Sequence, residues 1–147
     1  MNLESILEMW KNDSVIDEVQ LDESSRDSAK LHSKYLDLYS VAKLRQKDLE
    51  LKFKVILRDK FMHYSGKLSQ EEMDRKNWDY DPLNGLTVLK GDLDKWYDAD
   101  EVIQDHQKKM AYQEQVVATL KEILDNIKWR HQTIKNMIEW RKFTSGI

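Results

Sequence analysis

Residues 31–67 read "LHSKYLDLYSVAKLRQKDLELKFKVILRDKFMHYSGK", and they decide the fold class because they hold no proline and no glycine before Gly66. Apolar residues recur in this stretch at steps of three, four or seven, namely Leu31, Tyr35, Leu38, Ala42, Leu49, Phe53 and Ile56. This spacing is typical of an amphipathic α-helix. It predicts one long helix from about Leu21 to Tyr64, with Gly66 as its C-cap glycine.

A second long helix is predicted from about Asp98 to Lys142, where glycine and proline are again absent. One seam position recurs at multiples of seven residues, at Ile103, Met110, Val117, Leu124 and Ile138. The second seam position holds Leu120, Ile127 and Ile134. Together the two positions give a face like that of a coiled coil.

The remaining segments are shorter, and the fold class that follows is all-α. Leu3, Ile6, Leu7 and Trp10 predict a short helix that ends near Trp10. Residues 68–97 contain the one proline and an Asn-Gly pair, which predicts a structured acidic loop with at most a short extended piece at Thr87–Leu89. The chain therefore divides into a helical part at 1–67, a loop connector at 68–97 and a second helical part at 98–147.

Composition favours a soluble protein of a reducing compartment. There is no cysteine, and therefore no disulfide or thiolate metal site. The sequence has no run of eighteen apolar residues, which is the length needed to cross a membrane. Its first ten residues are acidic, where a signal peptide would be basic. We expect a cytoplasmic protein without membrane contact.

The net charge of −3 conceals blocks of opposite sign. Lys and Arg against Asp and Glu number 2 to 8 in residues 1–29 and 10 to 4 in residues 30–67. The counts are 4 to 10 in residues 68–101 and 8 to 5 in residues 102–147. A basic segment between acidic ones fits polyanion binding, docking of acidic on basic subunit surfaces, or ordinary solvated helices.

Enzyme signatures are absent from the sequence. Glycines are too sparse for a phosphate-binding loop, and no H-E-x-x-H or E-x-x-H motif occurs. "DLDKWYDADE" resembles a calcium loop, but Trp96 and Tyr97 occupy a ligand position and the glycine position. His32, His63, His106 and His131 are scattered and read as helix-face residues. We expect no catalysis, no cofactor and no metal.

A basic stripe follows one side of the first long helix. At about 100° per residue, Lys43, Lys47, Lys54 and Arg58 lie within roughly 60° of one another, with Phe61 in the same sector. Glu50 lies inside the stripe and weakens it. The segment "RDKFMHYSGK" at 58–67 adds Lys60, Tyr64 and Lys67. Cations with aromatic rings are what single-stranded nucleic acid requires, although a solvated surface has the same composition.

The stretch 31–67 also resembles the UvsY family of recombination mediator proteins of T4-like tailed bacteriophages. The shared features are the Leu-aromatic-Ser-Lys-aromatic-Leu opening, the basic-x-basic pair and Tyr-Ser-Gly. "LESILEMWKNDSVID" at 3–17 matches as well, whereas "TVLKGDLD" at 87–94 and the C-terminal helix match more loosely.

The resemblance implies a cytoplasmic protein of the phage-infected bacterium that binds single-stranded DNA as a ring of six or seven subunits. Such a protein helps a RecA-like recombinase displace single-strand-binding protein. The pair attributed to DNA binding falls on Arg58 and Lys60, with Asp59 where the family has a small residue. On an ideal helix Lys60 falls on the apolar side, so either the helix unwinds there or Lys60 faces an opening between subunits.

Assembly is expected to depend on the C-terminal helix, because that helix is apolar on two sides. Trp129 and Trp140, eleven residues apart, share a face opposite the seam. A monomer that folds back could cover both sides, and so could a ring. The candidate oligomerisation residues are Val117, Leu120, Leu124, Ile127, Trp129, Ile134, Ile138 and Trp140.

The main alternative is a structural helical oligomer, such as a phage scaffold or adaptor. In that case the basic segment docks onto an acidic segment of a neighbouring subunit and DNA binding is absent. The acidic stretches 1–29 and 68–101 are either contacts for partner proteins or solubilising surface.

Overall fold

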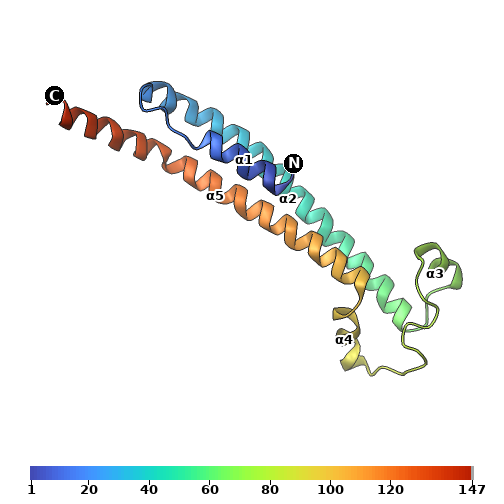
Figure 1. Cartoon of the computed structure of the whole chain (residues 1–147). Coiled ribbons are helices and arrows are strands. Elements are labelled where there is room, and N and C mark those ends of the chain that lie inside the picture. The colour runs from blue at the N-terminus through green and yellow to red at the C-terminus, as the bar shows by residue number, and fades with distance from the viewer. Residues whose placement is uncertain (147) are drawn as a thin grey trace. The chain divides into compact units, whose positions relative to one another are not determined.

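The computed structural model describes residues 1–146, which form helices and connecting loops (Figure 1). The elements in order are α1 (Leu3–Asp13), α2 (Leu21–Tyr64), α3 (Gln70–Lys76), the 3₁₀ turn η1 (Lys90–Asp92), α4 (Leu93–Asp98) and α5 (Glu101–Thr144). These 146 residues include no strand, which confirms the all-α prediction.

The bounds of the long helices agree closely with the sequence pattern. Helix α2 begins and ends at the predicted residues, and α5 begins three residues after Asp98 and ends two after Lys142. Helix α1 continues to Asp13, beyond the predicted end at Trp10. Gly66 has a left-handed φ of +72°, and the N–H of Lys67 donates to the carbonyl of Met62, as expected of a glycine-ended helix.

The prediction of a loop over residues 68–97 was incomplete, because this segment holds helix α3, the turn η1 and most of helix α4. Helix α3 begins after Ser69, whose hydroxyl accepts the N–H of Glu72 at 3.2 Å. Its C-cap is Asn77, which adopts a left-handed φ of 57°. Ser69 and Glu72 have the spacing of a capping box, so the start of this helix could have been predicted from the sequence. Thr87–Leu89 forms no strand.

The chain groups into two compact units, which are described separately. The first unit comprises Met1–Gln46 and Gln113–Ile147, and the second comprises Lys47–Tyr112. In the first unit α1 packs with parts of α2 and α5 (Figure 1). The buried cluster of this unit consists of Ile6, Tyr35, Ala42, Val116, Val117, Leu120, Ile123, Leu124 and Ile127.

Polar contacts fix the end of α1 in the first unit. Tyr35, which is fully buried, donates its hydroxyl to the Asp13 carboxylate at 2.9 Å, and Lys34 pairs with the same oxygen at 2.7 Å. Arg130 of α5 donates to the carbonyls of Ser14 and Val15 at 3.1 and 3.0 Å. A guanidinium there satisfies carbonyls at the negative end of α1, so the turn after α1 is held to α5.

Candidate nucleic-acid interface

The cations of the predicted stripe that belong to the second unit lie on α2. Lys47, Lys54 and Arg58 are all exposed, as the helical pattern predicts for a polar face. Glu50 is 3.8 Å from Lys47, so this carboxylate does offset one cation. Lys43, the other residue of the predicted stripe, belongs to the first unit and is also exposed.

Lys60 points into the interior of the second unit. Its residue is 4% exposed, and its Nζ lies 3.0 Å from an Asp100 carboxylate oxygen and 3.9 Å from the ring centroid of Trp78. Helix α2 continues through Lys60 to Tyr64, so unwinding at this point was the wrong alternative. The ammonium contacts a buried carboxylate and an aromatic face, and both contacts offset the free-energy cost of removing the cation from water.

Asp100 joins the start of α5 to the end of α2. Its carboxylate accepts the Tyr64 hydroxyl at 2.7 Å and the N–H of Ile103 at 3.0 Å, in addition to the contact with Lys60. Burial raises the pKa of Asp100, but these hydrogen bonds and the Lys60 charge outweigh it and hold that pKa below 3.8. Burial, with the Asp100 contact, raises the pKa of the Tyr64 phenol. The Tyr64 hydroxyl therefore donates its hydrogen bond to Asp100 inside the second unit.

Asp59 lies between two cations from different elements. Arg58 donates to one carboxylate oxygen from Nη2 at 3.1 Å and from Nε at 3.3 Å. Lys76, the last residue of α3, reaches the other oxygen at 3.3 Å. Lys76 was not among the residues predicted from the sequence, because nothing in a linear pattern shows that α3 returns to this point.

His63 and Trp78 hold the segment that follows α3. The His63 ring is buried, and its Nε2 lies 2.6 Å from the carbonyl oxygen of Asp79. The His63 and Trp78 ring centroids are 5.1 Å apart, and the Nζ of Lys76 is 5.1 Å from the Trp78 centroid. These contacts fix the position of Lys76 relative to the end of α2.

An aromatic ring is available beside the exposed cations. Phe61 is 44% exposed, and the Nζ of Lys67 lies 6.0 Å from its ring centroid. Phe61 and Tyr64 line a cavity of about 330 Å³ whose other walls include Leu86, Leu89 and Lys90. An exposed ring next to cations provides the surface on which a base can stack while its phosphates are neutralised.

The predicted oligomerisation residues divide in the first unit into a buried group and an exposed pair of tryptophans, with Ile138 intermediate between them. Five of them are buried in this chain: Val117, Leu120, Leu124, Ile127 and Ile134. Ile138 is half-buried. Trp129 and Trp140 are exposed, at 69% and 66%, and Trp140 stacks on Phe143 with ring centroids 5.8 Å apart. Only the second group presents a large apolar surface to solvent.

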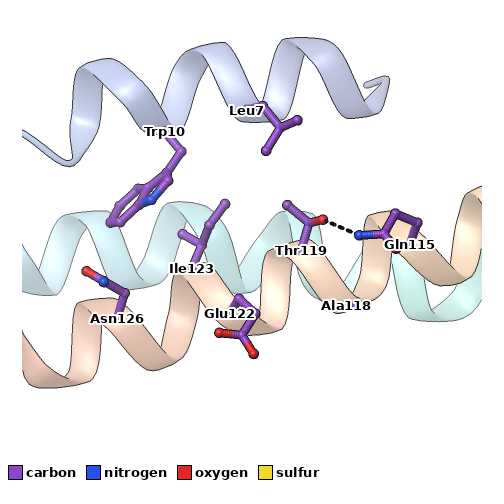
Figure 2. Close-up of a pocket in the computed structure, with 8 residues that line it drawn as sticks. All are labelled: Leu7, Trp10, Gln115, Ala118, Thr119, Glu122, Ile123 and Asn126. Atoms are coloured by element: carbon purple, nitrogen blue, oxygen red, sulfur yellow. Dashed lines mark hydrogen bonds between the residues drawn. The ribbon is translucent and has the colours of Figure 1, made fainter.

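A groove between α1 and α5 marks a further surface of the first unit (Figure 2). Leu7 and Trp10 of α1 face Ile123 and Thr119 of α5 across a space of about 330 Å³. Gln115, Glu122 and Asn126 add polar groups to this groove.

Two further properties of residues 1–146 bear on function. Within this described part, no group of three or more His, Cys, Asp or Glu side chains is arranged to hold a metal ion. None of the helices in the same residues combines the length and apolar character needed to cross a membrane.

The described residues form an all-α protein whose helix α2 carries exposed cations and an exposed ring, a combination that also occurs in proteins that bind single strands. A family model described as recombination, repair and ssDNA binding protein UvsY matches residues 9–147. The chain belongs to the UvsY family.

Solved structures show the same fold. A crystal structure of the bacteriophage T4 recombination mediator protein UvsY, lattice type II, is 26% identical and superposes with a TM-score of 0.81, covering 99% of this chain and 98% of that one. Lattice type I of the same phage protein gives 25% identity and a TM-score of 0.79, over 95% and 98% of the two chains. No curated protein sequence matches significantly.

The Lys60–Asp100 pair predicts a specific pattern of stability. Lys60→Met should lower the free energy of unfolding by about 3–5 kcal/mol, because it leaves a buried carboxylate without its cation. Lys60→Met/Asp100→Asn should recover much of this loss, since an amide at position 100 still caps α5. Urea unfolding followed by circular dichroism at neutral pH measures both.

The same double variant should respond less to acid. The pKa of Asp100 is lower in the folded state than its ordinary value of 3.8. The ionised carboxylate therefore stabilises the fold above pH 3.8, and this stabilisation is lost as the pH falls through the lower pKa of the folded state. Wild type should therefore lose more stability than the double variant below about pH 4. Equal losses in the two proteins would contradict the assigned role of Asp100.

Proposed function

We propose that this protein is a recombination mediator that binds single-stranded DNA and helps load a RecA-like recombinase onto strands covered by single-strand-binding protein. The observation that carries the proposal is the placement of exposed Lys54, Arg58 and Phe61 along one end of α2. Membership of a family described by recombination, repair and single-stranded-DNA binding supports the same conclusion. The family description supports single-stranded-DNA binding in recombination and repair. The loading of a recombinase is the part that we propose in addition.

Few cations per subunit make assembly important for affinity. Four phosphate contacts on a single strand give a salt slope of about −3 and weak binding. Repetition of the same surface around a ring of six or seven subunits multiplies these contacts on one strand. We propose that such a ring holds the strand in a conformation that the recombinase prefers and that single-strand-binding protein binds less well.

The exposed apolar surface of the first unit supports head-to-tail assembly. Trp140 and Phe143 form a protruding pair beside the cation Lys142, whereas the groove of Leu7 and Trp10 carries the exposed carboxylate Glu122. Contact between two different patches of the same chain generates a ring when the rotation closes. We propose that these patches meet between neighbouring subunits.

DNA binding is tested with a labelled oligo(dT) by fluorescence anisotropy over a salt series. Lys54→Ala/Arg58→Ala should weaken binding and reduce the magnitude of the salt slope by about 1.4 for each subunit that holds the strand. Lys108→Ala/Lys109→Ala removes the same charge from exposed positions of α5 and should have a smaller effect. Light scattering confirms that the variants keep the wild-type mass.

The scaffold alternative makes the opposite prediction. A structural oligomer should not bind the oligonucleotide even at low salt, and its mass should fall as salt rises. A DNA-binding protein that fails to load recombinase onto strands precoated with single-strand-binding protein would retain the family function but contradict the loading step.

Assembly is tested with Trp140→Ala/Phe143→Ala. Loss of a buried aromatic anchor costs about 2 kcal/mol or more, so the concentration at which the oligomer dissociates should rise at least about tenfold. Leu86→Ala/Leu89→Ala removes exposed apolar side chains from the second unit and is the matched control. Sedimentation velocity measures the dissociation, and an unchanged profile would contradict the assigned contact.

A further inference from the structure

Asp59 occupies two of the Arg58 donors, and a second cation, Lys76, contacts the same carboxylate. We propose that Lys76 of α3, together with Arg58, forms a two-cation phosphate-binding site for single-stranded DNA, in place of the sequence neighbour Lys60. This inference rests on the proposed DNA-binding function and names a residue that the basic helix itself does not contain.

The geometry brings the two cations to one carboxylate. Arg58 contacts one oxygen of Asp59 at 3.1 Å, and Lys76 contacts the other at 3.3 Å. The Arg58 side chain is 68% exposed and that of Lys76 is 26% exposed, whereas Asp59 is 14% exposed. The three groups carry a net charge of +1. Arg58 Nη1 makes no contact with Asp59, and the Lys76 ammonium has further donors, so both can also bind a phosphate oxygen.

Lys60 is not available for this purpose in the folded unit. Its side chain is 5% exposed and is paired with Asp100, whose side chain is 6% exposed. For Lys60 to reach a phosphate it would have to leave a buried carboxylate without a cation, which is strongly unfavourable. The basic-x-basic pair of the sequence is therefore divided between the interior and the surface.

The acidic side chains nearest to Lys76 on its own helix have partners. Glu72 pairs with Arg75, and Asp74 accepts the Tyr80 hydroxyl. Arg75 offsets the charge of Glu72, whereas the neutral Tyr80 hydroxyl leaves Asp74 charged. Asp59 is the carboxylate in direct contact with both Lys76 and Arg58. The ring of Trp78 beside Lys76 limits where its ammonium can go.

The proposal is tested by anisotropy with labelled oligo(dT) and the full-length protein. Lys76→Ala should lower the affinity by at least about fivefold at 0.1 M salt and reduce the magnitude of the salt slope by about 0.7 for each engaged subunit. Lys108→Ala, which also removes a lysine paired with an aspartate, should leave both nearly unchanged. Circular dichroism checks that helicity is retained.

A second pair of variants separates the two lysines and the carboxylate. Lys60→Met/Asp100→Asn keeps the interior neutral, so it should bind DNA like wild type. Asp59→Asn raises the charge of the site from +1 to +2, so it should bind DNA more tightly and with a steeper salt slope.

The outcomes distinguish this inference from the proposed function. If Lys76→Ala matches Lys108→Ala while wild type binds, the assignment of Lys76 is overturned and DNA binding stands. If a folded Lys60→Met/Asp100→Asn protein loses as much affinity as Lys76→Ala, Lys60 contacts DNA and the inference also fails. If wild type does not bind the oligonucleotide, the proposed function itself fails.

Discussion

The second unit depends on the buried ion pair between Lys60 and Asp100. This pair connects the last turns of α2 with the first turn of α5, although the two residues are far apart along the chain. Tyr64 and the N–H of Ile103 complete the hydrogen bonding of the carboxylate, which makes burial of the two charges tolerable. The Lys60 ammonium in turn fixes Trp78, and with it the chain that returns from α3.

This interior pair determines which cations remain for an anionic partner. With Lys60 directed inward, Lys54 and Arg58 present charge on the helix surface, and the returning segment adds Lys76 next to Asp59. Phe61 remains exposed on the same end of the helix. A surface with exposed cations and an exposed ring suits a flexible single strand, whose bases are free to stack, better than a duplex.

The long helices were predictable because their apolar spacing is regular and Gly66 marks the end of α2. An ideal helix places Lys60 on the apolar side, but we expected unwinding or an opening between subunits there, because its pairing with Asp100 depends on tertiary contacts that the sequence does not show. The periodic seam of α5 could not show whether Leu120 and Ile127 pack against this chain or another, because both solutions require the same spacing. Lys76 was missed for a similar reason, because its contact with Asp59 follows from the position of α3.

Lysine acetylation footprinting with mass spectrometry, with and without oligo(dT), tests most directly the claim that the fold divides the basic segment between interior and surface. Our account predicts that Lys54 and Lys76 react in the free protein and become protected when the oligonucleotide is bound, whereas Lys60 stays unreactive in both states. A Lys60 that reacts readily in the free protein and is protected by DNA, with Lys76 unaffected, would contradict it.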